Sequence, residues 1–400
     1  MKSRARLHQI NYFFMSIYNK ALEQVTLADI EELVSNQVSE SKVIDYKRLL
    51  PEDKDRSKKE FLADVASFAN AGGGDLVYGM VESGGIPQRV AGIKLKDPEE
   101  AALRLEHIIR DGVDPRIYGA EVRAVEMGSE RYIVIVRIPR SWSAPHMVSY
   151  QGYGKFFSRN SYGKHPLDAS EIRTAFSFSQ QNLDYLRDFR MQRIGALVAG
   201  ETPVPVPESS RLVLHVVPFS INNPRTNIDI SQFEYSHQLP TGVFGNEPVH
   251  QRFNFDGYVQ YSDATYLQIF RTGAVELVET NFLSFSKGKS FIEPMYEAEV
   301  LERLDELMSF LKRMRIEPPF LVMLSLLAVG STYMGKNSAF HWYDSHPIDR
   351  PDLLIPEVLV EDYAVLLNKA MKPAFYAVWN AAGWPRSMNY NEEGEWSGVG

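Results

Sequence analysis

Hydrophobic and polar positions in the first fifty residues follow two different periods. Leu27, Ile30, Leu33 and Val34 recur at helical spacing, which predicts a short helix with one buried face. The stretch ESKVIDYK, residues 40–47, comes next and has the alternation of a strand. We therefore expect a helix followed directly by a strand that carries several charged side chains.

A second helix is predicted over residues 57–69, because Phe61, Val65 and Phe68 lie at helical spacing. The sequence Ser-Lys-Lys-Glu that begins it has the form of a capping box. Glycines at residues 72–74 are typical of a helix end, since glycine adopts the left-handed conformation found there. The apolar run DLVYGMV, residues 75–81, is then expected to be a buried strand.

The remaining elements of the first half complete an α+β domain. They are a helix beginning at Asp97-Pro98 and ending near residue 112, a hairpin of residues 121–127 and 131–139, a strand at 155–158 and a helix at 168–177. We assign residues 1–25 to an N-terminal arm and residues 26–178 to this domain.

The second half of the chain is predicted to form another α+β domain. Residues 179–210 combine a helix at 183–197 with the proline-rich segment GETPVPVPESS, which is typical of a linker. The domain at 211–400 is expected to have strands at 212–217, 252–261, 265–271 and 274–279, and helices at 297–313 and 358–380. Its many aromatic residues suggest a packed module for sensing or interaction.

Composition excludes several kinds of site. The 400 residues include no cysteine, so disulfides, cysteine nucleophiles and zinc-thiolate sites cannot form. The longest apolar run, residues 318–330, is shorter than the ~18 residues that a membrane span needs and is expected to be a buried strand or helix. The N-terminus lacks the sustained apolar region of a secretory signal. We therefore expect a cytoplasmic protein with no membrane contact.

Charge is distributed unevenly. Residues 1–200 contain 28 Lys and Arg against 26 Asp and Glu, whereas residues 201–400 contain 15 against 25. The overall net charge of −8 argues against a protein that coats nucleic acid by bulk attraction. If nucleic acid is a partner, the N-terminal half should bind it, although a solvated charged face explains the imbalance equally well.

Three acids and one lysine are candidates for a metal-dependent hydrolytic centre. In a regular strand Asp45 and Lys47 share a face, and Glu40 joins them only if residues 40–42 lie outside the strand. Glu82, at the end of the expected strand 75–81, supplies a third acid. Carboxylates suit Mg²⁺ or Mn²⁺, and a lysine can position a phosphate. Acids near strand ends are common, so ordinary surface charge is the competing interpretation.

The glycine triplet does not indicate a nucleotide site. Phosphate-binding loops run from strand through glycines to helix, so that the helix N-terminus faces the anion. Here the predicted order is helix, glycines, strand, and no G-x-x-x-x-G-K-[ST] pattern occurs in the chain. A helix end with close backbone packing accounts for these glycines better.

Five blocks within residues 26–178 resemble, in order, the Schlafen AlbA-like domain, including its E-S-x-x-x-[ED]-[FY]-K opening. They are ESKVIDYKRLLP, EFLADVASFANAGGGDLVYGMVESGGIP, LRLEHIIRDGVDPRIYG, IVIVRIPRSWSAPHMV and FFSRNSYGKHPLDASEIRTAF. The second half, with RFNFDGY, YLQIFRTGAVE and VWNAAGW, is similar to the tail of bacterial proteins that carry this domain.

The resemblance implies a metal-dependent endoribonuclease acting on transfer RNA or ribosomal RNA. It places the metal ligands on Glu40, Asp45 and Glu82, with Mg²⁺ or Mn²⁺ as cofactor, and Lys47 at the scissile phosphate. Two features depart from the family: the third acid is usually Asp, and the zinc site of the animal proteins cannot form without cysteine. Animal Schlafen nucleases pair two such lobes, so one copy per chain implies a homodimer.

A basic stretch with aromatic residues is the candidate nucleic-acid surface. Lys47, Arg48, Lys155, Arg159 and Lys164 are the expected backbone contacts. Phe156, Phe157 and Tyr162 lie among the last three and could stack on bases, although a strand with core aromatics is the slightly better account.

The leading hypothesis is a Schlafen-type endoribonuclease, which by analogy suits defence against phage. The main alternative is a non-catalytic regulator that binds DNA, in which the acids only support the fold. A divergent ATP-binding protein and an interaction scaffold built on the acidic second half are less favoured. RNA is the expected partner, with DNA as the alternative.

Overall fold

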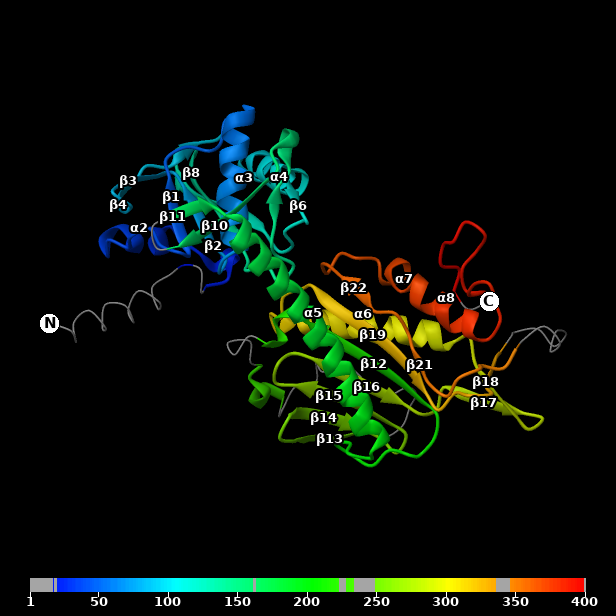
Figure 1. The fold of residues 1–400 in the computed structure, drawn as a ribbon. Helices are drawn as coiled ribbons and strands as arrows, with labels where there is room; N and C mark the ends of the chain where they lie inside the picture. Colours follow the sequence, from blue (N-terminus) through cyan, green and yellow to red (C-terminus); the bar gives the residue numbers. More distant parts are fainter. Residues whose placement is uncertain are drawn as a thin grey trace. The chain divides into compact units, whose positions relative to one another are not determined.

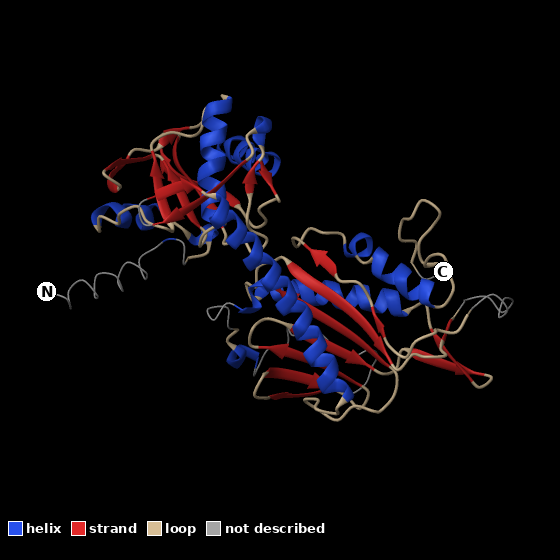
Figure 2. Ribbon diagram, viewed as in Figure 1, coloured by secondary structure: helices blue, strands red, loops and turns tan. Residues whose placement is uncertain are grey.

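The computed structural model describes residues 17, 20–160, 163–222, 228–233, 249–335 and 346–398. The chain divides into two compact units, Met1–Gln181 and Asn182–Gly400, which Figure 1 and Figure 2 show. Most of the expected arm 1–25 lies outside the described residues, as does Tyr162; the described part of the arm contains the 3-10 helix η2 (Leu22–Gln24).

The first unit is an α+β domain built on two larger sheets and a separate two-stranded hairpin. Its five-stranded sheet has the order β1-β2-β8-β5, with β7 also paired to β8; only β1 and β2 run parallel. These strands are β1 (Ile44–Lys47), β2 (Gly74–Tyr78), β5 (Ile93–Lys94), β7 (Glu121–Gly128) and β8 (Arg131–Ile138). The four-stranded sheet has the order β11-β10-β9-β6, formed by β6 (Val113–Asp114), β9 (Met147–Val148), β10 (Lys155–Asn160) and β11 (Gly163–Pro166).

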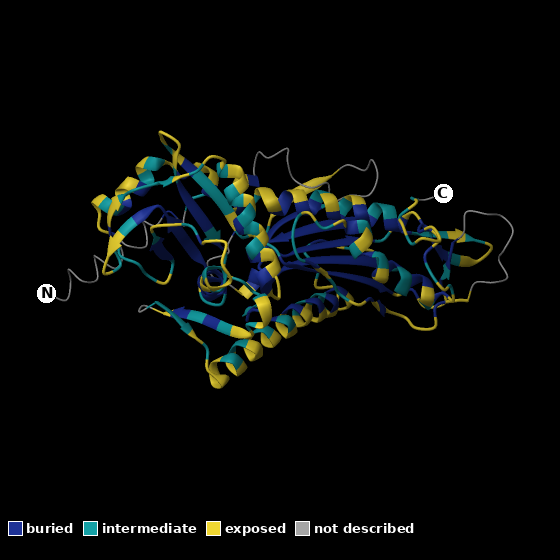
Figure 3. Ribbon diagram, turned by 90° about the horizontal axis from the view of Figure 1, so that it is seen from above, coloured by how far each residue is buried: buried dark blue, intermediate teal, exposed yellow. Residues whose placement is uncertain are grey.

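Helices cover both faces of the five-stranded sheet. The helices are α2 (Leu27–Ser35), α3 (Asp55–Ala69) and α4 (Pro98–Gly112). Because side chains alternate along a strand, Leu76 and Tyr78 of β2 pack in the core with α3 and α4, whereas Val77 packs on the opposite face with α2. In Figure 3 the strands are mostly dark blue, which marks buried residues, and the helices have exposed residues, drawn in yellow, on their outer faces.

Local signals explain where these helices begin and end. Thr26 and Asp29 form a capping box at α2, which was not predicted. The Asp97 side chain accepts hydrogen bonds from the Glu99 and Glu100 amides, and α4 begins at Pro98 as predicted. The capping box predicted at Ser57 is wrong: α3 begins at Asp55, and the Ser57 hydroxyl accepts a hydrogen bond from the Glu52 N–H instead.

The predicted strand 75–81 is interrupted at Gly79. Gly79 has a φ of 95°, and a side chain there would lie 2.8 Å from Ile133 Cδ1, so the chain turns sharply at a glycine. The run therefore forms β2 and a separate strand β3 (Met80–Ser83), which makes a hairpin with β4 (Ile86–Val90). Glu82 consequently belongs to this hairpin rather than to the end of the buried strand.

The two helices expected around residues 168–197 form one continuous helix, α5 (Ala169–Val198). No proline or glycine lies between residues 169 and 194 to interrupt it. Asp168 caps its start by accepting hydrogen bonds from the amides of Ser170 and Glu171.

The second unit contains an eight-stranded sheet, ordered β13-β14-β15-β16-β12-β19-β21, with β22 also on β19. Its strands are β12 (Arg211–Pro218), β13 (His250–Phe253), β14 (Gly257–Tyr261), β15 (Thr265–Phe270), β16 (Val275–Glu279), β19 (Phe320–Leu327), β21 (Leu353–Leu354) and β22 (Val358–Val360). A smaller sheet comprises β17 (Leu283–Ser286), β18 (Lys289–Ile292) and β20 (Tyr333–Met334).

The large sheet of the second unit is covered on both faces. One face packs against α6 (Tyr296–Arg313) and α8 (Lys372–Ala381), and the other packs against the last turns of α5. The short elements are α7 (Leu367–Ala370), η3 (Tyr150–Gly152), η4 (Phe219–Asn222) and η5 (Ile230–Phe233). The apolar run 318–330 contains the fully buried strand β19.

Two expectations for the second unit are wrong in detail. The predicted helix 358–380 begins only at Leu367, because residues 358–360 pair with β19 as β22. The predicted strand 252–261 is a hairpin, in which the Asn254 side chain accepts a hydrogen bond from the Gly257 N–H at the turn. In the part of the chain that the structure describes, no helix combines the length and apolar character of a membrane span.

Candidate functional site

Asp45, in the middle of β1, is a buried carboxylate held by two cations. Lys47 lies on the same face of the strand, and its Nζ is 2.7 Å from Asp45 Oδ1. Arg159 reaches across from β10 and donates from Nη2 to Asp45 Oδ2 at 3.0 Å. Burial alone would raise the pKa of Asp45, but the two cations outweigh it and hold that pKa below its ordinary value.

Glu40 lies beside Asp45, as expected if residues 40–42 are outside the strand. Strand β1 begins only at Ile44, and a turn closed by the Ser41 N–H and the Ile44 carbonyl precedes it. Glu40 Oε1 accepts a hydrogen bond from the Tyr46 N–H at 3.0 Å. Burial raises the pKa of Glu40 to about 6; the Tyr46 amide opposes this rise, and the neighbouring Asp45 carboxylate adds to it.

Glu82 is connected to Glu40 through Gly85, in the turn of the β3–β4 hairpin. The Gly85 N–H donates to Glu82 Oε2, and the Gly85 carbonyl accepts from the Glu40 N–H, each at 2.7 Å. The Glu82 carboxylate is thus held in place by a hydrogen bond from the backbone of the hairpin turn. Among the described residues, no group of three or more acidic or histidine side chains is arranged to hold a metal ion. Glu40 and Asp45 are therefore the pair that could share a cation, and the role of Glu82 stays a prediction.

Helix α3 contributes an acidic residue that the sequence did not single out. Asp64 is buried, and the Nζ of Lys164 lies 2.8 Å from its Oδ1 and 2.6 Å from Glu60 Oε1. Burial raises the pKa of Asp64, and Lys164 and Lys47 oppose that rise. The sequence offered one signal for Asp64: it lies four residues after Glu60, on the same face of the helix, and its neighbours in the helix are apolar.

The basic residues predicted to contact nucleic acid have different surroundings. Arg48 and Lys155 are exposed. Arg159 is buried, with its guanidinium 3.8 Å from the centre of the Phe68 ring, and Lys164 is paired with acids of α3. A nucleic-acid contact by either of these last two would require its ion pair to open, so Arg159 first of all positions Asp45.

A second cluster of cations and aromatic rings joins Lys155 and Phe157, which the sequence singled out, to Lys59 and Tyr153, which it did not. The Nζ atoms of Lys59 and Lys155 lie 5.4 Å and 5.3 Å from the centre of the Tyr153 ring. Tyr153 in turn stacks on Phe157 with centroids 6.3 Å apart. Two ammonium groups around one partly exposed ring suit a phosphate and a stacked base. Lys59 precedes Tyr153 by 94 residues in the chain, which is why sequence spacing alone did not connect it with residues 153–155.

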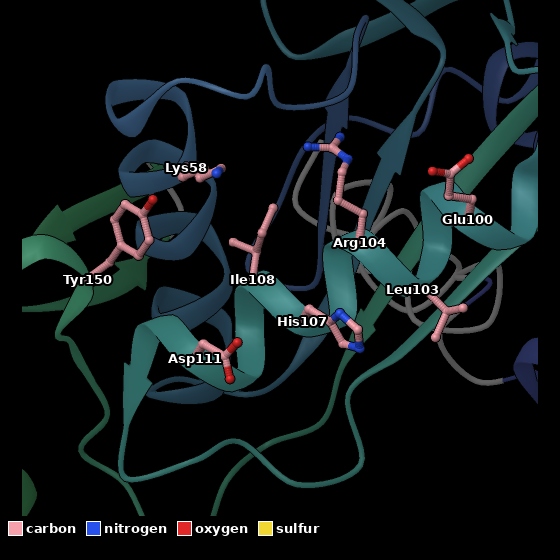
Figure 4. A pocket seen from close by; sticks show the side chains of 8 residues that line it. All are labelled: Lys58, Glu100, Leu103, Arg104, His107, Ile108, Asp111 and Tyr150. Atoms are coloured by element: carbon pink, nitrogen blue, oxygen red, sulfur yellow. The ribbon is translucent and has the colours of Figure 1, made fainter.

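Figure 4 shows a separate pocket of about 490 Å³ between α3 and α4. Six of its side chains come from α4, with Lys58 and Tyr150 beside them. Lys58 Nζ lies 2.5 Å from Asp53 Oδ1 and 6.0 Å from the Tyr150 ring centre. The pocket contains both cations and acids and is lined by none of the residues predicted for the metal centre.

A comparison with known protein families finds a match in the first unit, which contains Glu40, Asp45 and Arg159. Residues 40–168 match the family described as "Schlafen, AlbA_2". The first unit carries a Schlafen AlbA_2 domain. The match begins at Glu40 and ends at Asp168, the cap of α5, so it includes Asp45, Glu82 and Arg159. The Schlafen AlbA_2 domain indicates a function related to nucleic acid, without distinguishing RNA from DNA.

Solved structures give weaker likenesses. The DIP2311 protein from Corynebacterium diphtheriae is 16% identical, with a TM-score of 0.26; the match covers 36% of this chain and 27% of that one. The N-terminal domain of a RecG-related protein from Nitrosomonas europaea is 24% identical, with a TM-score of 0.22, covering 28% of this chain and 70% of that one. The chain thus spans about a quarter of the first relative. No curated protein matches the chain by sequence.

Proposed function

We propose that the Schlafen AlbA_2 domain of this protein binds RNA and hydrolyses its phosphodiester bonds with Mg²⁺ or Mn²⁺. The observation that carries the proposal is the half-buried carboxyl group of Glu40 beside Asp45: burial raises the pKa of Glu40 to about 6, and the Asp45 carboxylate adds to that rise. Ionised Glu40 therefore faces a like charge at a half-buried position, although Asp45 itself is paired with Lys47 and Arg159. A divalent cation between them removes that repulsion.

The acidic residues and Arg159 have different roles in this proposal. Glu40 and Asp45 would hold the cation, and Glu82, whose carboxylate accepts a hydrogen bond from the Gly85 N–H, is proposed as a third ligand. When bound, the cation supplies Lewis acidity and a water of lowered pKa. Arg159 is a positioning residue, because it touches Asp45 from the buried side.

Lys47 binds the scissile phosphate. Its side chain is 37% exposed while its ammonium group lies on Asp45, so it is held at the surface of the centre. Burial would lower the pKa of Lys47, but the carboxylates of Asp64, Asp45 and Glu40 outweigh it and raise that pKa, so the side chain stays charged. Arg48 and the Tyr153 cluster provide contacts to the rest of the RNA backbone.

Cleavage of total transfer RNA and of single-stranded DNA tests the proposal. Full-length wild type is compared with Glu40→Gln and Asp45→Asn, each with Mn²⁺ and with chelator. Glu31→Gln, on the exposed surface of α2, is the matched control. We expect metal-dependent cutting of RNA by wild type and Glu31→Gln, and at least a 100-fold loss in both site variants. Metal-independent cutting, or full activity of both site variants, would refute the metal centre.

A non-catalytic regulator that binds DNA is the second candidate. It is favoured by the ion pairs on both oxygens of Asp45, which suit a structural role. For this second candidate, we expect the wild type to bind nucleic acid without cutting it and the binding to weaken steeply as the salt concentration is raised. An interaction scaffold with an apolar interface shows no such salt dependence.

We also propose that two chains pair through their Schlafen AlbA_2 domains, because one copy is matched per chain. Light scattering at micromolar concentration distinguishes a dimer from a monomer. A role in defence against phage is a further proposal by analogy, which a change in phage resistance on deletion would support.

A further inference from the structure

A pocket lined by Trp142 lies in the first unit, apart from the acidic centre. It has a volume of about 440 Å³, and all of its lining residues fall between Asn70 and Phe178. We call it the Trp142 pocket; Arg140, Ser158 and Thr174 also line it. Its size falls within the range of pockets that hold small ligands, and it is large enough for a nucleobase.

Two aromatic side chains and one cation give the Trp142 pocket its character. The Arg140 guanidinium lies 4.2 Å from the centre of a Trp142 ring. Phe178, from α5, is 53% exposed although it is a large apolar residue. Flat rings that remain accessible to solvent offer stacking surfaces, and a guanidinium beside them attracts a phosphate attached to the stacked group.

The pocket is held in place before any ligand arrives. The Asn70 side chain, at the end of α3, accepts a hydrogen bond from the His146 N–H at 2.7 Å. Its Nδ2 donates to the carbonyls of His146 and Phe157 at 2.9 and 2.8 Å. These three bonds tie α3, the segment that follows β8, and β10 together around the pocket. A preformed pocket saves the ordering cost that a mobile one would have on binding.

Small polar groups supply hydrogen bonds for the edge of a base. The hydroxyl of Thr174 donates to the Ser170 carbonyl at 3.0 Å, which leaves its oxygen able to accept. Ser158 and Ser170 contribute two more hydroxyls to the lining. The lining also contains one acid, Glu171, whose carboxylate accepts a hydrogen bond from the Asp168 N–H. Aromatic walls with these polar groups and the Arg140 cation match an unpaired nucleobase with its phosphate better than they match a purely apolar side chain.

The position on β10 separates this pocket from the acidic centre. Ser158 lines the pocket, whereas the next residue, Arg159, holds Asp45. Consecutive side chains of a strand point to opposite faces, so the two sites lie on opposite faces of β10. A base in the pocket therefore belongs to a nucleotide other than the one being cut.

We infer that the Trp142 pocket binds an unpaired base of single-stranded RNA and so favours unpaired over duplex substrates. The inference rests on the nucleic-acid function proposed above, but not on cleavage. It assigns Trp142 and Phe178 to stacking, and Arg140 to the adjoining phosphate.

Binding of fluorescein-labelled single-stranded RNA and of the matched duplex tests this inference, measured by anisotropy in chelator so that nothing is cut. We expect Trp142→Leu to weaken single-strand binding about 10-fold or more, with Trp142→Tyr largely restoring it. Phe178→Ala should show a smaller loss. Phe176→Ala is the matched control, because Phe176 is 52% exposed on the same helix but does not line the pocket. Duplex binding should be unchanged in all four variants.

A second readout uses tryptophan fluorescence of the full-length protein titrated with uridine 5′-monophosphate or ribose 5-phosphate. Saturable quenching by the nucleotide alone, lost in Trp142→Leu, supports a base site. Equal quenching by ribose 5-phosphate, or equal single-strand affinity of wild type and Trp142→Leu, overturns it. Both readouts measure binding, so they test the pocket even if the protein cuts no RNA. Cleavage by wild type is measured separately and does not depend on the pocket, so failure of one proposal can be told from failure of the other.

Discussion

Replacing Glu40 by glutamine should stabilise the first unit, although Glu40 is the residue on which the proposed chemistry depends. Glutamine keeps the oxygen that accepts the Tyr46 N–H and removes the charge that faces Asp45. The pKa of Glu40 rises from an ordinary 4.5 to about 6 in the folded protein. Ionised Glu40 is therefore a cost to folding at neutral pH.

The size and sign of this cost follow from linkage. A rise of one pKa unit corresponds to about 1.4 kcal/mol, so the full shift would amount to about 2 kcal/mol. Because the carboxyl group is only half buried and water screens it, we expect about 1 kcal/mol. Below pH 4.5 Glu40 is protonated in both states and the cost vanishes; above pH 6 it is complete. The gain from Glu40→Gln should accordingly appear between these values and reach its maximum above them.

Hydrogen exchange of peptides from β2 and β8 measures this locally, at pH 7.5 and at about pH 3.5, where Glu40 is protonated in both states. Exchange from these buried strands in Glu40→Gln should be about five-fold slower than in wild type at the higher pH and unchanged at the lower. The control Glu31→Gln should change neither, because that side chain is exposed. Faster exchange in Glu40→Gln at pH 7.5, or the same difference at both pH values, would refute the reasoning.

Two further predictions concern buried ion pairs, one in each unit. Arg159→Met leaves the buried Asp45 with one cation instead of two and should destabilise the first unit by about 3 kcal/mol. The control Arg48→Met, at an exposed position, should change the stability by less than about 0.5 kcal/mol. Equal melting temperatures of the two variants would contradict this prediction. In the second unit, Glu276 is fully buried between His215 and Arg193. Burial alone would raise the pKa of Glu276, but the hydrogen bonds with His215 and Arg193 outweigh it and lower that pKa to about 2. Its contribution of about 3 kcal/mol is therefore complete above pH 4.5 and lost as the pH falls through about 2. Glu276→Gln should lose that stability at pH 7 and flatten the acid dependence, which urea unfolding at several pH values would show.

Local patterns in the sequence were enough to determine much of the fold. The cap at Asp97, the hairpin of β7 and β8, and the α+β class of both halves follow from period and turn chemistry, which act over a few residues. The pairing of Asp45 with Lys47 also follows, because a strand has only two faces. The family opening at Glu40 marked the same place in the chain.

Only the tertiary structure decided which distant residues complete the site. Arg159 lies 114 residues from Asp45, and Asp64 meets Lys164 across one hundred residues, so no local period could connect them. The turn at Gly79 is held by backbone from other segments: its N–H donates to the Lys47 carbonyl, and its carbonyl accepts from the Ala91 and Gly92 amides. This turn places Glu82 in a hairpin instead of on the buried strand. A sequence records which side chains are available and which face of their own element they occupy. Contacts between elements, and the burial that sets the pKa of Glu40, arise only when the chain has folded.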